Sequence, residues 1–407
     1  MKKNTSVPIT RTGSISLLVL VVALITSLIG MGLMQLSLGS YRMATRTANE
    51  IAARSAADAG IAKAIYEMNE QVKTGIWDDA TLPVAVNENL SGCDATFSYT
   101  VTVDGEGVCS ISSVGQSGQV QRTVNSTLQM NGPWEYGLFF AEDIGFGKHA
   151  SVDGYNFQPD HKIQNARIGT NSTAADTVSF LDGGGVDGDV LVGLNGDPDV
   201  VIDLGTAIIT GETYAMTKPV NLFPVTLPAY MNNLPSQGSM KIDTIVPITI
   251  TDDARYESIV FDKAALLIID GSVKLYVHKD IVMGSDSELQ IVSTNPNASL
   301  TLYLGGDFIT EKMAGINNLT QDPQKLKVYG LDSCVLMQPG KQAVFYGAIY
   351  APEAHVESTN ASEIFGSIVA KEFSTEKKVE IHYDASLQKA EIGDQNVTFS
   401  VARWHEE

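Results

Sequence analysis

An uncharged stretch from Ser14 to Ser40 constrains this chain more than any other feature. Its centre, Ile15–Leu38, consists mostly of Leu, Val, Ile, Met and Gly. As a helix this segment would extend about 36 Å, which exceeds the hydrocarbon core of a bilayer at roughly 30 Å. A cleaved secretory signal is the alternative, because Lys2, Lys3 and Arg11 form a basic start. Such signals usually contain only about 7–15 apolar residues, so a single-pass membrane anchor is the better interpretation.

The helix is expected to continue beyond the membrane. From Tyr41 to Val72 the chain has no Pro and is rich in Ala, the best helix former, and Thr74-Gly75 follows. One helix from Ser14 to Val72 would be about 90 Å long. Small residues recur four positions apart at Ala23/Ser27 and Thr26/Gly30, a spacing that lets helices pack closely in membranes. We therefore expect neighbouring helices as partners.

Composition narrows the possible functions and folds of the rest of the chain. The 407 residues include 27 basic and 47 acidic side chains, a net charge of -20 that would repel nucleic acid. No nucleic-acid partner is therefore expected. The 36 glycines, set against only 18% charged residues, favour many short strands joined by tight turns.

The pattern after the helix predicts two β-rich parts. Residues 95–130 alternate apolar and polar side chains in three runs with a turn at Asp104-Gly105, as in an antiparallel meander. After Gly132-Pro133, short apolar strands alternate with Gly, Asn and Asp turns. The expected organisation is a leader (1–13), the helix (14–74), a small antiparallel β domain (75–131), a β-solenoid (132–390) and a C-terminal tail (391–407).

The solenoid is expected to be a right-handed parallel β-helix. Gly347-Ala348-Ile349-Tyr350-Ala351 and Gly366-Ser367-Ile368-Val369-Ala370 match at a spacing of 19 residues, close to one turn of such a fold. Ile349 should then stack on Ile368 and Tyr350 on Val369. The 35 residues from Gly271 to Gly306 are close to two turns by the same reasoning. A β-sandwich with irregular strands is the alternative.

No catalytic, cofactor-binding or metal-binding residue is predicted. The six histidines show no spacing that would let two of them share a metal ion. Acidic turns at 182–189 and 195–199 favour a weaker hypothesis of calcium binding, although Asp and Gly are also ordinary turn residues. A lyase-like groove for acidic sugars would need more positive charge than the three arginines after residue 130 provide.

Two cysteines are candidates for a disulfide. Cys93 and Cys109 lie around one expected hairpin, at a spacing where a bridge would restrict the unfolded chain. The alternative is two ordinary thiols, which is also the interpretation for Cys334. No Cys-x-x-Cys pair is present that could hold zinc.

The N-terminal region resembles type IV pilins, and more closely PilX-type pilus assembly proteins. The resemblance is carried by the leader ending Arg11-Thr12-Gly13, the start Ser14-Ile15-Ser16-Leu17-Leu18, and the helical stretches at 41–44 and 56–60. It implies cleavage by a prepilin peptidase between Gly13 and Ser14. It also implies assembly with other pilin-like subunits through the helix. Arg42, Arg46 and Arg54 follow the apolar segment and offset the charge asymmetry that normally sets membrane topology. We still expect an inner-membrane protein whose C-terminal part lies in the periplasm or outside the cell.

One departure from that family defines the expected role. Most pilins carry Glu as the fifth residue after the cleavage site, where this chain has Leu18. In the family this Glu is thought to pair with the free amine of a neighbouring subunit. Its absence favours a minor structural subunit of a type IV pilus or related secretion filament.

Residues 138–388 resemble the β-solenoid domain found behind PilX-type N-termini. The segments that carry the likeness are 192–198, 300–306, 348–354 and 382–387. This resemblance supports an architecture more than an activity, and we expect no enzymatic activity. The alternative function is a membrane-anchored adhesin or lyase-like protein that binds or modifies polysaccharide, with surface glycans as partners.

We predict that the mature chain begins at Ser14. The leader ends immediately before the apolar run, whereas an ordinary secretory signal is cut after its apolar region. Mass spectrometry of the mature N-terminus distinguishes the two, and a start at or after Ser40 would refute both the anchor and the pilin-like interpretation.

Overall fold

The computed structural model describes residues 14–74, 81–104, 108–155, 162–163, 165–243, 246–359, 361–388 and 393–406. These residues form two compact units. The first combines the chain up to Glu67 with residues 79–128 and 401–407, and the second combines residues 68–78 with 129–400.

A single long helix begins the described chain. Helix α1 runs from Ser14 to Lys73, so the predicted helix and both of its ends are confirmed to within one residue. In its second half, buried side chains recur at three- and four-residue intervals and form one face; they include Ala53, Ala56, Ala57, Ile61 and Ala64. Most of these side chains are as small as a methyl group, which permits close packing on that face.

The antiparallel meander is confirmed. Its strands, in their order across the sheet, are β1 (Val84–Asn89), β2 (Thr96–Val103), β3 (Cys109–Ser117), β4 (Val120–Asn131) and β32 (Thr398–Glu406). Strand β32 lies beside β4, so most of the expected C-terminal tail is instead part of this sheet. Its alternating start, Thr398-Phe399-Ser400-Val401, is typical of a strand.

The register of the meander rules out the possible disulfide between Cys93 and Cys109. Cys109 lies opposite Val103 at one end of the β2–β3 ladder, whereas Cys93 precedes β2 at the other end. Bridged cysteines need Cα atoms within about 7 Å, and the length of β2 separates these two. Cys93 is exposed, Cys109 is buried, and they are not joined.

The second unit consists mainly of parallel ladders, in which most strands pair with an equivalent strand about one turn of chain away. The strands of the first ladder, in their order across the sheet, are β15 (Thr213–Ala215), β12 (Gly188–Val192), β9 (Ala166–Thr170), β5 (Leu138–Phe140), β30 (Glu363–Thr375), β29 (Val344–Ser358), β27 (Leu326–Gly330), β24 (Ser299–Leu304), β21 (Ser272–Val277) and β18 (Ala254–Tyr256).

A second ladder runs beside it and shares the later parts of β30 and β29. Its other strands are β13 (Ile202–Asp203), β10 (Val178–Phe180), β6 (Ile144–Phe146), β28 (Leu336–Met337), β25 (Phe308–Thr310), β22 (Ile281–Met283), β19 (Ser258–Phe261) and β16 (Ser239–Ile242).

The third ladder uses the early parts of β30 and β29. It includes β14 (Ile208–Ile209), β11 (Gly185–Val186), β7 (Ser151–Tyr155), which also pairs with the antiparallel β8 (Lys162–Ile163), and β31 (Glu380–Asp384). A separate four-stranded parallel sheet holds β17 (Ile248–Ile250), β20 (Leu266–Ile269), β23 (Glu288–Ile291) and β26 (Gly315–Asn318). Short helical turns are α2 (Pro198–Val201), α3 (Ala229–Asn233), η1 (Pro133–Glu135), η2 (Pro323–Lys325) and η3 (Ala385–Gln388).

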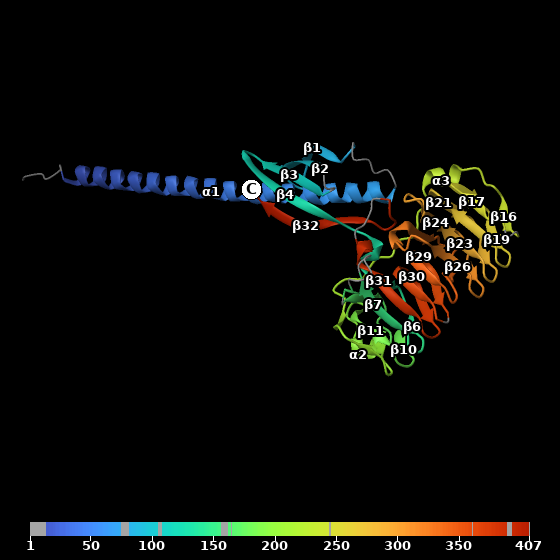
Figure 1. The fold of residues 1–407 in the computed structure, drawn as a ribbon. Helices are drawn as coiled ribbons and strands as arrows, with labels where there is room; N and C mark the ends of the chain where they lie inside the picture. Colours follow the sequence, from blue (N-terminus) through green and yellow to red (C-terminus); the bar gives the residue numbers. More distant parts are fainter. Residues whose placement is uncertain are drawn as a thin grey trace, which may run out of the picture. The chain divides into compact units, whose positions relative to one another are not determined.

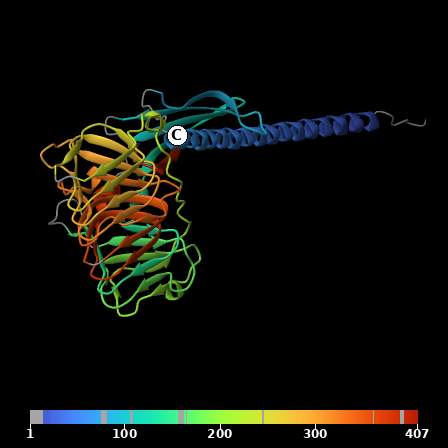
Figure 2. The same cartoon turned by 90° about the vertical axis from the view of Figure 1, so that its right-hand side faces the viewer.

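The order of strands along the ladders is not the order along the chain. Strand β30 pairs with β29 on one side and with β5 and β6 on the other, and β31 pairs with β7. Figure 2 shows the result within this unit as green strands, then red, then orange and yellow. The stack therefore joins residues 138–155 directly to residues 363–384. Apart from β8, the described strands of this sheet are parallel and do not close on themselves, and the right-handed sense stays a prediction.

The short-range stacking was predicted correctly, but one longer spacing was wrong. Ile349 pairs with Ile368 and Tyr350 with Val369, as expected from the matched segments. The interval from Gly271 to Gly306 does not span two turns, because Ser272 already pairs with Ser299. The wrong spacing compared glycines that precede strands of different ladders, β21 and β25.

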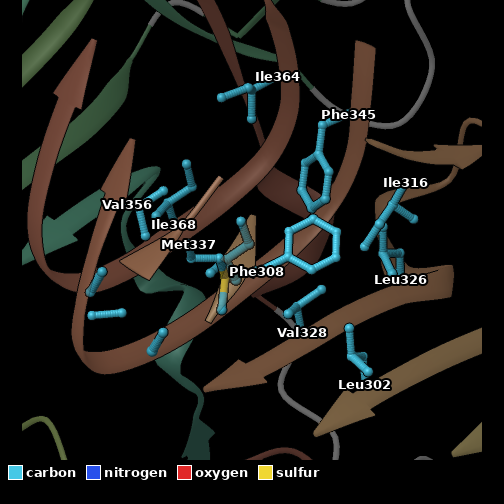
Figure 3. Close-up of a cluster of buried hydrophobic side chains, with 14 of the residues drawn as sticks. Leu302, Phe308, Ile316, Leu326, Val328, Met337, Phe345, Val356, Ile364 and Ile368 are labelled. Carbon is cyan, nitrogen blue, oxygen red and sulfur yellow. The ribbon is translucent and has the colours of Figure 1, made fainter. Parts of the chain in front are cut away.

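The core lies between the ladders. Along the first ladder, inward-facing side chains stack in register and are almost fully buried: Leu275, Leu302, Val328, Ile349, Ile368, Leu138, Ile168 and Val190. Figure 3 shows Leu302, Val328 and Ile368 together with Phe308, Met337 and Phe345 in this core. Each turn of chain leaves apolar surface exposed at its edge, which only the next turn can cover.

A long connection returns the chain from one end of the stack to the other. It follows β15 and runs over an outer column of aromatic side chains, which consists of Tyr276, Tyr303, Tyr329 and Tyr350 on successive strands. The Tyr350 hydroxyl donates to Phe223 O at 2.7 Å, and the Asn171 amide pairs with both backbone groups of Val220. Burial raises the pKa of Tyr303 to about 12. The connection is thus held to the stack at Val220 and Phe223, and its later part contains α3, which is labelled in Figure 1.

We predict that Ile368→Ala lowers the free energy of unfolding by about 2–5 kcal/mol, because it opens a cavity between two turns of chain. Ile368 is fully buried between Ile349 and Leu138. The control is Val344→Ala in the neighbouring strand, where the side chain is 41% exposed. Unfolding midpoints of the full chain compare the two, and equal losses would contradict the stacked core.

Candidate membrane and assembly segment

The first half of α1 exposes an unbroken apolar surface. Among the described residues, α1 is the helix that is long and apolar enough to cross a membrane, and the apolar part of it is not buried. Every large apolar side chain in this part is at least 46% exposed: Ile15, Leu17, Leu18, Val19, Leu20, Val21, Val22, Leu24, Ile25, Leu28, Ile29, Met31, Leu33, Met34, Leu36 and Leu38. Soluble proteins rarely expose a contiguous apolar surface of this size, so lipid or other helices must cover it.

Small residues interrupt this surface. A methyl group added at Gly30, Gly32 or Gly39 would meet no atom outside the helix backbone within 4 Å. A second helix could therefore approach these positions closely. The Thr26 hydroxyl donates to the carbonyls of Val22 and Ala23, both at 3.0 Å. Because this hydroxyl is satisfied inside its own helix, Thr26 is compatible with an apolar environment.

Charged side chains begin where the apolar surface ends. Arg46 pairs with Glu50 at 3.1 Å, and Arg54 pairs with Glu406 of β32 at 3.5 Å. The Arg122 guanidinium lies 3.8 Å from Glu50 and 3.9 Å from Glu406, joining these pairs into one network. The side chains are partly exposed, so each pair contributes little to stability. Their main consequence is to place charged groups, which cannot enter the hydrocarbon core, directly after the apolar half of α1.

The second half of α1 packs on the antiparallel sheet at very short range. A Cβ at Gly115 of β3 would lie 1.9 Å from the carbonyl oxygen of Ala53, and one at Gly60 would lie 2.2 Å from the Ser113 hydroxyl. No side chain fits at Gly115, because the atom it would meet belongs to the helix backbone. Glycine in this strand therefore sets the separation between helix and sheet.

Polar groups fix the helix on the sheet farther along. The Tyr99 hydroxyl of β2 donates to Glu67, and Lys63 pairs with both Glu67 and Glu88 of β1. Burial, followed by the hydrogen bond to Glu67, raises the pKa of Tyr99 well above its usual range. The phenol therefore stays protonated and remains a donor to Glu67 at any physiological pH.

The predicted site residues have different outcomes. Gly13 lies outside the described residues, and Ser14 begins α1, so the cleavage between them stays a prediction. Leu18 is 65% exposed on the apolar surface of the helix. Neither the docking glycines Gly60 and Gly115 nor the pairing of Arg54 with Glu406 was predicted. A glycine inside an alternating strand was the available signal for Gly115.

The acidic turns considered for calcium use their carboxylates within the protein. Asp182 accepts from the Thr206 hydroxyl at 3.0 Å, and Asp187 accepts from the Thr210 hydroxyl at 2.8 Å. Asp197 accepts from the backbone N–H of Asp199 at 3.1 Å, at the start of α2. Asp189 accepts from the N–H of Glu212 at 2.9 Å. These bonds favour the interpretation of ordinary turn residues.

Comparisons with known proteins cover part of the chain. A family described as a domain of unknown function (DUF7305) matches residues 252–390, about a third of the chain. No curated protein matches. The competence-associated pilin ComZ from Thermus thermophilus is 11% identical with a TM-score of 0.22, and the alignment covers 88% of this chain and 97% of that one.

Two ice-binding proteins align over 61% of this chain and 94% of their own. The protein from Antarctomyces psychrotrophicus is 10% identical with a TM-score of 0.29. The domain from Shewanella frigidimarina is 11% identical with a TM-score of 0.26. At these scores none of the three likenesses bears on the fold or function of this chain.

We predict that Gly115→Ala weakens the docking of α1 on its sheet by about 1–3 kcal/mol, because the added methyl group overlaps the helix backbone. Gly39→Ala is the matched control, since its methyl group would meet nothing within 4 Å. Hydrogen exchange of residues 50–67 should increase in Gly115→Ala and not in Gly39→Ala. Unchanged protection in both variants would refute the tight packing.

Proposed function

We propose that this chain is a minor pilin-like structural subunit of a type IV pilus or related secretion filament. The observation that supports this most is the division of α1 into two halves. One half is apolar and uncovered on all sides, and the other is packed against the protein's own sheet. A helix built in this way can leave the membrane and insert among the helices of neighbouring subunits without unfolding its own domain.

The proposed partners follow from this helix. Other pilin-like subunits would cover the apolar half in the filament, and lipid would cover it before assembly. A prepilin peptidase would cut between Gly13 and Ser14. We place the chain in the inner membrane as a single-pass protein, with both β-rich units in the periplasm or outside the cell. We expect no enzymatic activity; surface glycans are further candidate partners.

A low copy number is proposed from Leu18. A neighbouring subunit with a free N-terminal amine would have to bury that charge in an apolar bundle, and Leu18 offers no carboxylate to pair with it. An unpaired buried charge costs several kcal/mol. The unit formed by residues 129–400 adds bulk to every copy. Both features suit a position that few copies occupy, such as the tip.

We also propose that the parallel ladders wind in a right-handed sense, as a β-solenoid of non-sequential turns. Connections between parallel strands of one sheet are right-handed in about 98% of cases. This rule applies to β18 and β21, which pair in parallel in one sheet and are connected through β19 and β20. An experimental structure that shows a left-handed path through these strands would overturn this assignment.

The role is tested by deleting the gene and measuring filaments. We expect loss or strong reduction of sheared pili, and restoration by the intact gene. In filaments from the wild-type strain, quantitative proteomics should find this chain at a small fraction of the major subunit. A variant in which Leu24 and Ile25 are both replaced by Asp disables the apolar half of α1 and leaves the packed half unchanged. Unlike the intact gene, this variant should not restore the sheared pili.

Two results would contradict the proposal. Normal numbers of filaments in the deletion strain would exclude a required role in assembly. Recovery of this chain as the dominant protein of purified filaments would exclude a minor role, while leaving the membrane anchor intact.

A further inference from the structure

Three metal-ligating side chains meet on the outer side of the third ladder. Glu363 belongs to β30, and Glu380 and His382 belong to β31. One potential ligand atom from each residue lies within 4.8 Å of the other two. In the described part of the chain, these are the three His, Cys, Asp or Glu side chains that lie close enough together to hold one metal ion. The two carboxylates are partly exposed, so an ion could reach them from solvent.

The imidazole is aimed at the two carboxylates without a hydrogen bond to either. His382 Nε2 lies 3.4 Å from Glu363 Oε1 and 4.0 Å from Glu380 Oε2. This nitrogen has less than 1 Å² of accessible surface and no hydrogen-bond partner. A buried polar atom without a partner costs free energy, so its position between two carboxylate oxygens calls for an explanation.

The other side of the ring is held in place. His382 Nδ1 lies 2.7 Å from Asp153 Oδ1 in β7, and the ring stacks on Phe365 at 4.5 Å between centroids. An ionised carboxylate only accepts, so in the neutral ring Nδ1 carries the proton and Nε2 keeps its lone pair. A carboxylate that orients a histidine in this way is the usual outer partner of a metal-bound imidazole.

The backbone register brings like charges together at this place. Glu363 and Glu380 are directly opposite each other in neighbouring strands, and Phe365 is opposite His382. Carboxylates facing each other across a strand pair are destabilising unless a cation lies between them. A divalent ion at this position would relieve that repulsion and would satisfy Nε2.

We propose that Glu363, Glu380 and His382 bind one divalent transition-metal cation, with Zn²⁺ as the reference ion. Asp153 is the positioning residue of this site. One imidazole and two carboxylates suit zinc and similar ions, and three protein ligands leave a position for water. Ca²⁺ is disfavoured because it takes six to eight oxygen ligands.

The site would join β30 and β31, and through Asp153 it would also reach β7, which is distant in the sequence. β31 lies between β30 and β7, and Asp153 is 229 residues from His382. A bound ion would therefore strengthen the contact between the late and the early turns of the stack. Sequence analysis missed the site because its donors come from two strands and its positioning residue, Asp153, from a third. Glu380 and His382, two residues apart on one face of a strand, were the available signal.

The test uses the full-length chain in detergent micelles, with any affinity tag removed and metal stripped by a chelator. Titration with Zn²⁺ should show one ion per chain and raise the thermal unfolding midpoint. Glu380→Gln should weaken Zn²⁺ binding at least tenfold. The matched control is Glu376→Gln, an exposed glutamate four residues earlier that should bind like the wild type.

Two further variants separate this site from other histidines and from a structural effect. His355→Gln removes an imidazole that faces a single carboxylate, Glu372, and should leave the affinity unchanged. Asp153→Asn should weaken binding about 10–100-fold and change the visible spectrum of the Co²⁺-loaded protein. Ca²⁺ should not compete with Zn²⁺.

The proposal is overturned if the wild-type chain retains no Zn²⁺ at one ion per chain. It is equally overturned if Glu380→Gln and Glu376→Gln bind with the same affinity, since the bound ion would then lie elsewhere. Neither result bears on the helix or on its role in a filament.

Discussion

The backbone ladders that join β30 and β31 to β5, β6 and β7 are the interaction on which the second unit depends. They connect residues 363–384 with residues 138–155, so the turns that come last in the sequence cover the turns that come first. Without them the buried faces of Leu138 and Ile368 would both be exposed. Because β5, β6 and β7 pair on that side with β30 and β31, the unit is complete only when residues up to Asp384 are in place. The candidate metal site lies on the same contact.

Sequence reasoning found the elements and missed the order in which they meet. Helix α1, the meander and the stacking of Ile349 on Ile368 follow from local patterns: Ala content, alternation and a repeated Gly-x-Ile motif. Which turn lies beside which could not be predicted, because every turn presents the same buried aliphatic residues to its neighbours. The pairing of Ile368 with Leu138 therefore has no signature in either segment. The strand in the C-terminal tail has an alternating start, but its partner β4 is about 270 residues earlier, so no local pattern indicated where it would pair.

The candidate functional segment was predictable to a greater degree. An uncharged run of this length has few physical solutions, and the structure leaves it uncovered as expected. What the sequence did not reveal is how firmly the rest of the helix is held. Gly115 brings β3 against the backbone of Ala53, and Tyr99 and Lys63 add polar contacts to the same unit. The helix therefore has a fixed half and an available half, which is the property that assembly through helices requires.

Photo-crosslinking from the available half tests the central claim most directly. A photoreactive phenylalanine analogue would replace Leu24, which is 56% exposed on α1, and Met313, which is 54% exposed in the second unit, would serve as the control position. The account predicts adducts between Leu24 and other proteins that carry an apolar N-terminal helix in cells that assemble filaments, and no such adducts from Met313. Adducts of Leu24 with lipid alone would contradict assembly through the helix and leave only a membrane anchor.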